Sequence, residues 1–206
     1  MGETKHKKQA LATKKRIRNT ALQLMRKHSI DEVSVNDICE KAKVGVGTFY
    51  YYYKAKNDIL LEVFEEADAI FVKLNKCESL KTISPYDYII QHCLCYAEFI
   101  TETGVEFTKK LYSIQSKVFI DKDRAIYSTL RTFLEQKQKS NLIDPSFDVQ
   151  EFCHTTIACV RGIVYDWCLH EGSYDLVKAT NAFAEIYLEK YKPLLSFKAE
   201  PMSFAL

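Results

Sequence analysis

The chain is poor in the residues that interrupt helices. Only 6 glycines and 4 prolines occur among its 206 residues. A β-sandwich or barrel needs many turns, which are usually built from glycine and proline, so the composition argues against an all-β fold. Long apolar runs are also missing, because no stretch approaches the roughly eighteen consecutive apolar residues of a membrane-spanning helix. We therefore predict an all-α protein with no membrane span.

Signals for export and for catalysis are equally scarce. The first eight residues, Met-Gly-Glu-Thr-Lys-His-Lys-Lys, have no apolar run behind them and do not resemble a secretory signal, so we expect a cytoplasmic protein. The sequence contains no nucleophile elbow, zinc-ligand spacing or paired carboxylates. Gly45 and Gly47 form a lone G-x-G with no strand before it. We predict that the chain is not an enzyme and that it holds no cofactor and no metal.

The seven cysteines are an odd number, and none lies in a paired metal-binding motif. Cys93 and Cys95 form C-x-C, and the others are scattered. In a cytosolic chain this pattern is typical of free thiols that pack as small apolar residues. One alternative stays open, namely a DNA-binding thiol or metal sensor that uses Cys93 and Cys95, with Cys77 or His92 as further partners.

The net charge of +2 hides an asymmetry along the chain. Residues 1–56 carry 13 lysines and arginines against 5 acidic residues, a balance of +8, whereas residues 57–206 carry 16 against 22, a balance of −6. A basic segment joined to an acidic remainder is typical of a nucleic-acid-binding module attached to a second domain that does not contact the DNA phosphates. Residues 1–8, with Lys5, Lys7 and Lys8, read as a disordered basic arm.

The segment from residue 33 to residue 59 predicts two short helices joined by a tight turn. Ser34 is a typical N-cap, because its side chain can accept a hydrogen bond from an N–H of the first helical turn. Val35, Ile38 and Ala42 then recur at helical spacing. Gly45 supplies backbone freedom in the turn, and a second helix is expected from about residue 46.

This second helix has two different sides. On a helical wheel one side carries apolar and aromatic residues that can hold the helix onto its neighbours, namely Val46, Phe49 and Tyr53. The opposite side carries a small residue, a hydroxyl and two phenols, namely Gly47, Thr48, Tyr51 and Tyr52. Lysines flank the helix at positions 43, 54 and 56. Such a face suits a DNA major groove better than solvent.

In this order the residues resemble the recognition-helix signature of the tetracycline-repressor (TetR) family. The matching positions are Gly47, Thr48, Phe49, Tyr50, Tyr53 and Lys56. Upstream, the first helix of the family is matched by Ile17, Ala21, Leu24 and Met25, and the second by Ser34, Val35 and Ile38. The resemblance covers roughly the first quarter of the chain and implies a helix-turn-helix transcriptional regulator, with repression as the family's usual mode.

The resemblance also implies roles for single residues. Tyr50 and Lys56 match positions that hold DNA phosphates. Ser34 and Asn36 lie at the start of the preceding helix, where backbone N–H groups also point at phosphate. The residues expected to face base edges are Val46, Gly47, Thr48, Tyr51 and Tyr52, with Val46 and the Thr48 methyl group suited to thymine methyls.

Two positions depart from the family pattern. Lys43 stands where the family usually has glycine, so the turn differs or Lys43 adds a phosphate contact. Gly45 stands where a serine or threonine commonly caps the recognition helix, a replacement that costs only a few tenths of a kcal/mol.

The remainder of the chain predicts further helices, about nine in all. We expect a helix-turn-helix domain over 1–56, a helical effector-binding and dimerisation domain over 57–195, and a disordered tail over 196–206. The expected helices span about 9–28, 35–42, 46–53, 56–75, 85–102, 106–113, 123–139, 148–170 and 173–191. Ser84 is expected to cap the helix that begins at Pro85, Asp148 to open the helix before the last, and Ser173 to cap the last helix. No linker rich in glycine, serine or proline separates the two domains, so the helix over 56–75 is expected to belong to both and to connect them.

Aromatic side chains in the middle helices suggest a pocket. The family resemblance implies a small-molecule effector there, and such a site needs an apolar cavity with a few polar anchors. The candidates are Phe71, Tyr88, His92, Tyr96, Phe99, Phe107, Tyr127 and His154. The competing interpretation is that aromatics at helical spacing are ordinary core.

The last two predicted helices, over 148–191, carry apolar surface wider than one stripe, which usually means burial on two sides. The resemblance implies that this pair forms a four-helix bundle with a second subunit. A two-fold pair of recognition helices would also read a palindromic operator on double-stranded DNA. We therefore predict a homodimeric, ligand-responsive transcriptional regulator.

Overall fold

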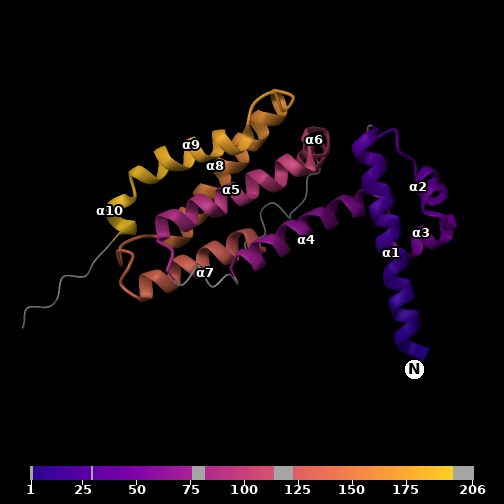
Figure 1. Ribbon diagram of the computed structural model, residues 1–206, viewed down its shortest axis with the longest axis horizontal. Coiled ribbons are helices and arrows are strands. Elements are labelled where there is room, and N and C mark those ends of the chain that lie inside the picture. Colours follow the sequence, from indigo (N-terminus) through magenta and orange to yellow (C-terminus); the bar gives the residue numbers. More distant parts are fainter. Residues whose placement is uncertain (1, 29, 76–81, 114–122, 197–206) are drawn as a thin grey trace, which may run out of the picture. The chain divides into compact units, whose positions relative to one another are not determined.

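The structure is a computed structural model that describes residues 2–28, 30–75, 82–113 and 123–196. Across these ranges it contains ten helices and no strand, which confirms the predicted all-α class (Figure 1). The helices are α1 (Gly2–Lys27), α2 (Val35–Ala42), α3 (Val46–Tyr52), α4 (Lys56–Leu74), α5 (Pro85–Thr103), α6 (Val105–Ser113), α7 (Ala125–Lys139), α8 (Val149–Leu169), α9 (Leu176–Glu189) and α10 (Lys192–Leu195). The four-residue α10 is the helix that was not predicted. Apart from Ser196, the predicted tail lies outside the described residues, as does Cys77.

The prediction of a disordered arm over residues 1–8 is wrong, because α1 already begins at Gly2. After Gly2 the segment contains no glycine or proline until well beyond residue 28. Its glutamate, lysines and glutamine all have high helix propensity. Nothing in the local sequence therefore stops the helix from extending to its first residues.

The helix starts mostly follow the predicted caps. The Ser84 side chain accepts a hydrogen bond from Asp87 N at 3.0 Å, and that of Asp148 accepts one from Glu151 N at 2.9 Å. The exception is α9, which Asp175 caps in place of the predicted Ser173. Trp167 Nε1 donates to the carbonyl of Tyr174 at 2.9 Å and so holds the preceding turn in a non-helical path.

The described helices fall into two compact units. The first contains residues 2–66 together with 106–113. In it α1 packs against α2, and α2 packs against α3. Its core is formed by side chains with at most 1% of their surface exposed, namely Ile17, Ala21, Met25, Ile38, Ala42, Phe49, Ile59, Leu60 and Leu111. Lys14 and Arg18 of α1 form ion pairs with Glu62 and Glu66 of α4.

The second unit contains residues 67–105 and 123–196. Its centre is α5, which packs against α7, α8, α9 and α10 (Figure 1). Arg124 of α7 holds Asp68 with two hydrogen bonds of 3.1 Å each. The chain passes from the first unit to the second within α4, at residue 66. None of the helices in the described ranges is both long and apolar enough to cross a membrane.

Candidate nucleic-acid interface and ligand pocket

The start of α2 is fixed by a reciprocal capping arrangement. Ser34 Oγ accepts a hydrogen bond from Asp37 N at 3.1 Å, and Asp37 Oδ2 accepts one from Ser34 N at 2.8 Å. This confirms Ser34 as the predicted N-cap. The Ser34 hydroxyl also donates to Asp37 Oδ2 at 2.6 Å, and these hydrogen bonds lower the pKa of the Asp37 carboxyl. Asn36 lies beside them with an exposed side chain.

In the turn between α2 and α3, Lys43 occupies the position where the family usually has glycine. Lys43 adopts the left-handed conformation, with φ 53° and ψ 53°. Its N–H bonds to the Glu40 carbonyl at 3.1 Å, and Val44 N bonds to the Cys39 carbonyl at 3.0 Å. The turn is therefore preserved, although a side chain other than glycine is strained there. Gly45 is the N-cap of α3 and, having no side chain, makes no side-chain capping bond.

The seven-residue α3 is exposed over most of its surface. Phe49 is its only buried residue. Val46, Tyr50 and Tyr51 are 41%, 54% and 80% exposed, values that are high for apolar and aromatic side chains. Gly47 and Thr48 are also exposed, and Tyr52 is half-buried, with its ring edge-on to that of Tyr51. A short helix with this surface needs a partner to cover it.

Two aromatic residues of the motif point inward, as predicted. Phe49 is completely buried, and Tyr53 is 3% exposed. The Tyr53 hydroxyl donates to Glu62 Oε2 of α4 at 3.2 Å. Burial, and then the nearby Glu62 carboxylate, raise the pKa of Tyr53 well above its usual value. These contacts fix α3 onto the rest of the first unit and leave its outer side free.

Lys56 is placed differently from the other candidate residues. Its ammonium group donates hydrogen bonds to the carbonyl oxygens of Ile30, Asp31 and Val33, at 2.7, 3.3 and 2.8 Å. These residues form the turn between α1 and α2. The Lys56 side chain thus bonds inside its own unit, whereas that of Lys54, two residues earlier, is exposed.

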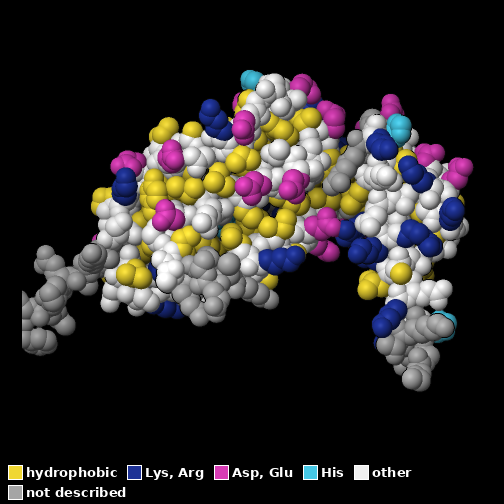
Figure 2. Space-filling model, in the orientation of Figure 1, with side chains coloured by type: hydrophobic (Ala, Val, Ile, Leu, Met, Phe, Trp, Pro, Cys, Tyr) yellow, Lys and Arg dark blue, Asp and Glu magenta, His cyan; other side chains and the backbone are white. Residues whose placement is uncertain are grey.

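The charge asymmetry is visible on the surface. Figure 2 shows lysine and arginine side chains gathered over the elements α1 to α3, while aspartate and glutamate predominate over the face of the second unit in view. The exposed α3 therefore belongs to a basic unit. An exposed, basic helix-turn-helix is the arrangement that binds DNA phosphates and presents a helix to the major groove.

In the second unit the structure brings four of the eight candidate ligand residues together. Phe71 of α4 and Tyr88, His92 and Tyr96 of α5 are at most 7% exposed. The Phe71 ring centroid lies 4.6 Å from that of His92 and 6.5 Å from that of Tyr96. Phe133 of α7, which the sequence did not single out, stacks on Tyr88 at 3.7 Å.

His92 is the polar member of this cluster. Its Nε2 lies 2.8 Å from the Ile126 carbonyl, so Nε2 carries the proton and donates it. Nδ1 is then an acceptor, and it is buried with no hydrogen-bond partner among the residues that the structure describes. Burial lowers the pKa of His92 to about 4, so the ring is neutral at physiological pH. A buried acceptor without a donor is an uncommon feature that a bound molecule would relieve.

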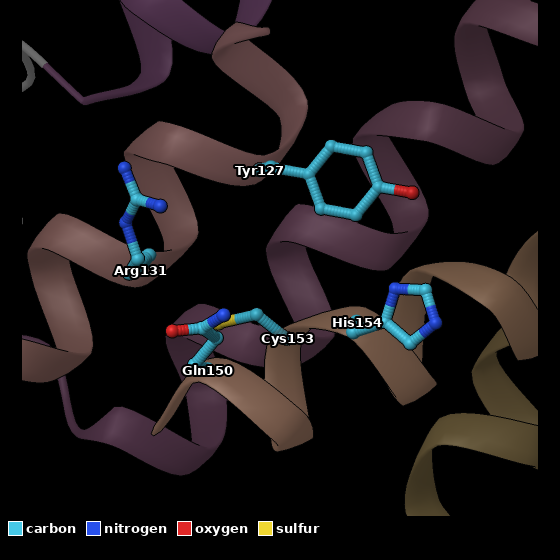
Figure 3. Close-up of a pocket in the computed structure, with 5 residues that line it drawn as sticks. All are labelled: Tyr127, Arg131, Gln150, Cys153 and His154. Carbon is cyan, nitrogen blue, oxygen red and sulfur yellow. The ribbon is translucent and has the colours of Figure 1, made fainter. Parts of the chain in front are cut away.

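Two more candidates, Tyr127 and His154, line a small pocket between α7 and α8. Its cavity volume is only about 20 Å³, room for about one water molecule, and Arg131, Gln150 and Cys153 complete the lining (Figure 3). The Tyr127 hydroxyl also accepts a hydrogen bond from Arg161 of α8 at 2.6 Å. Arg131 and Gln150 were not predicted, because single polar residues on separate helices carry no periodic signal.

The last two candidate ligand residues, Phe99 and Phe107, lie in neither the aromatic cluster nor the α7–α8 pocket. Phe99 is half-buried on α5 and makes no ring contact of the kind seen in the cluster. Phe107 is buried on α6, which packs with the first unit, so it does not belong to the aromatic cluster of the second unit.

The cysteines in the described ranges are free thiols. Burial raises the pKa of Cys93 to about 12 and that of Cys95 to about 11, so both are protonated near neutral pH. A protonated thiol is a poor nucleophile and a poor metal ligand. In the described parts of the chain, no group of three or more histidine, cysteine, aspartate or glutamate side chains is arranged to hold a metal ion. This geometry argues against a sensor built on Cys93 and Cys95.

The fold and the exposed α3 define a helix-turn-helix regulator with a helical second unit. Comparison with known proteins agrees: residues 17–63 match the family described as bacterial regulatory proteins, tetR family. The chain is 21% identical to the probable acrEF/envCD operon repressor of Escherichia coli K12 over 199 residues, which cover 91% of this chain and 90% of that relative. The predicted resemblance of the N-terminal segment to the TetR family of transcriptional regulators is therefore confirmed.

Other relatives share the fold at low identity. The fatty acid metabolism regulator protein of Bacillus subtilis 168 is 22% identical over 182 residues, covering 82% of this chain and 90% of that protein. The solved structure of FadR from Bacillus subtilis in complex with stearoyl-CoA has a TM-score of 0.63 at 19% identity and covers 83% of this chain and 95% of that one. The solved structure of FadR from Thermus thermophilus in complex with lauroyl-CoA has a TM-score of 0.63 at 16% identity and covers 91% of this chain and 98% of that one.

Proposed function

We propose that the protein is a homodimeric, ligand-responsive transcriptional repressor of the cytoplasm. In this proposal each subunit places α3 in the major groove of one half of a palindromic operator. A small apolar or aromatic effector in the second unit then lowers the affinity for DNA. The observation that carries the proposal is that only Phe49 of α3 is buried, in a unit with a strong positive balance of charge.

The DNA contacts divide by chemistry. We assign base-edge contacts to Val46, Gly47, Thr48, Tyr51 and Tyr52, because these residues form the outer side of α3. Tyr50 is exposed at the edge of that side and suits a phosphate oxygen. We also assign phosphate contacts to Ser34 and Asn36 at the N-terminal end of α2. The Ser34 hydroxyl itself already donates to Asp37.

The proposed dimer interface lies on α8 and α9, over residues 148–191. Tyr165 and Leu169 of α8 are 55% and 61% exposed, and Ile186 of α9 is 78% exposed. The two helices also pack against each other. Large exposed apolar residues on adjacent helices are typical of a subunit interface. A second copy of this chain also supplies the second recognition helix that a palindrome requires.

The proposed effector site is the aromatic cluster of the second unit together with the α7–α8 pocket. The fatty-acyl-CoA complexes of two structural relatives, and a third relative solved with resorcinol, support a ligand with an apolar chain or ring. His92 Nδ1 adds a polar criterion, since only a donor group on the ligand can pair with it. The effector can shift DNA binding only as far as its affinities for the two conformations differ.

The DNA-binding part is tested by gel shift with the DNA that flanks the protein's own gene. Tyr51→Ala combined with Thr48→Ala removes the outer side of α3 without touching Phe49, so we expect specific binding to be lost while the helical circular dichroism signal stays. Leu142→Ala, at an exposed apolar residue of the second unit, is the matched control and should bind normally. Normal binding by the double variant would refute the assignment of α3.

A further inference from the structure

The most specific polar interaction in the first unit is made by the lysine that begins α4. An ammonium group has three N–H donors, and Lys56 finds three carbonyl acceptors in one turn, on Ile30, Asp31 and Val33. Two of these distances, 2.7 and 2.8 Å, are typical of strong charge-assisted hydrogen bonds. The contact joins residues that are 23 to 26 positions apart in the chain.

The turn that Lys56 holds determines where the DNA-reading helices begin. Ile30 and Val33 are 5% and 3% exposed, so their side chains anchor the turn in the core while their carbonyl groups point to the ammonium. Carbonyl groups in the segment after a helix end need donor partners of this kind. Val33 immediately precedes the N-cap Ser34, so the ammonium fixes the start of α2 and, through the α2–α3 turn, the direction of α3.

We propose that Lys56 is a positioning residue for the recognition helix and not a phosphate contact, which is the role that the family resemblance implies. The proposal rests on the DNA-binding function proposed above. A phosphate would have to take the ammonium away from carbonyls that it already satisfies. The phosphate contact at this end of the motif then falls to Lys54, whose side chain is exposed.

Lysine footprinting of the intact protein tests this directly. The full-length chain is acetylated briefly with an N-hydroxysuccinimide ester in the absence of DNA, and the rate at each lysine is read by mass spectrometry. Lys54 should react quickly and Lys56 at least about tenfold more slowly, because its ammonium is held by three acceptors. Equal rates at Lys54 and Lys56 would overturn the proposal.

The same measurement with a random-sequence duplex at low salt separates the two roles further. DNA should protect Lys54 and leave the slow rate at Lys56 unchanged. Protection of Lys56 that appears only when DNA is present would identify a phosphate contact and reject a positioning role. The footprint of the free protein is independent of DNA binding, so it decides the question even if the duplex does not bind and the proposed function fails.

Substitution by arginine gives an independent readout, because arginine binds phosphate as well as lysine does but its flat guanidinium does not fit three converging carbonyls. We expect Lys56→Arg to lower operator affinity about tenfold, the effect of losing one charged hydrogen bond, and to lower the melting temperature. Lys54→Arg, the matched control, should bind like the unmodified protein. If Lys56→Arg also bound and melted normally, the positioning role would be excluded.

The salt dependence of binding adds a measurement that a general loss of stability does not change. Removing one phosphate contact lowers the slope of log K against log salt by about 0.9. Lys54→Met should show this decrease, whereas Lys56→Arg should keep the slope of the unmodified protein despite its weaker binding. A decreased slope for Lys56→Arg would contradict the proposal.

Discussion

At the scale of single residues, a side chain at position 47 is expected to have opposite effects on the stability of the free protein and on DNA binding. It lies within α3, and no atom comes within 4 Å of the position that a Cβ would occupy. An added methyl group therefore has room, and alanine stabilises a helix interior relative to glycine by about 0.5–1 kcal/mol. In the proposed complex the same methyl group would stand between α3 and the base edges.

We therefore expect Gly47→Ala to raise the melting temperature and yet weaken operator binding. The two effects are measured by thermal unfolding and by gel shift on the same preparation. The matched control is Gly162→Ala on α8, which also has open space around its Cβ position but lies outside the DNA-binding unit. Unchanged DNA affinity for Gly47→Ala would show that this position does not approach the bases.

His92 makes stability depend on pH. Its folded-state pKa of about 4 lies below the value of about 6.5 expected for the unfolded chain. Below pH 6.5 the His92 ring is therefore protonated in the unfolded state but stays neutral in the folded state until the pH approaches 4. The stability contributed by neutral His92 is complete above pH 6.5 and falls as the pH drops toward 4.

Between pH 6.5 and pH 5 this loss amounts to about 2 kcal/mol of unfolding free energy. Urea unfolding at the two pH values measures it. His92→Phe keeps an aromatic ring beside Phe71 and removes the titrating group, so its stability should change less over the same interval. Parallel pH curves for the two proteins would show that His92 is not the group responsible.

At the scale of elements, the turn between α2 and α3 contains a strained backbone conformation that a substitution by glycine should relieve. Lys43 has φ 53°, a conformation that costs roughly 1–2 kcal/mol for a residue with a side chain and little for glycine. We expect Lys43→Gly to stabilise the protein by about 0.5–1 kcal/mol, after allowing for the greater freedom of glycine in the unfolded state.

The control for that substitution is Lys41→Gly. Lys41 also has an exposed side chain but lies inside α2, where glycine is unfavourable, so this variant should be destabilised by a similar amount. Chemical denaturation of both variants measures the two changes. Destabilisation by Lys43→Gly would mean that the lysine side chain makes a contribution that outweighs its backbone strain.

At the scale of the whole molecule, the proposed dimer gives the most direct prediction. Ile186→Asp places a charge on a side chain that is 78% exposed, so the subunit should still fold. If α8 and α9 form the interface, the variant should be monomeric by light scattering and should lose most of its operator affinity. Leu142→Asp, at another exposed apolar residue (44%), is expected to stay dimeric.

A dimeric Ile186→Asp protein would exclude the α8–α9 surface. A monomer that retains full operator affinity would instead separate dimerisation from DNA binding.

Much of this protein follows from local sequence. Helical periodicity, the caps Ser34, Ser84 and Asp148, and the scarcity of glycine and proline predicted nearly all of the helices. The inward direction of Phe49 and Tyr53 was also predicted, since the direction of a side chain on a short helix depends on residues within two turns. The helical wheel was wrong for Val46, which it placed on the same side and which is 41% exposed in the first turn of α3. These features rest on interactions between near neighbours in the chain, which a sequence displays directly.

Only the tertiary structure decided the rest. It placed the Lys56 ammonium on the α1–α2 turn and grouped α6 with the first unit. It also joined Tyr127 and His154 to Arg131 in one pocket. A long lysine side chain can reach phosphate, carboxylate or carbonyl with equal ease, and helix periodicity does not say which distant helix a face will meet. Those outcomes depend on the packing of segments far apart in sequence. The family resemblance therefore predicts a phosphate contact for Lys56, whereas only the fold shows its ammonium bonded to carbonyls of the α1–α2 turn.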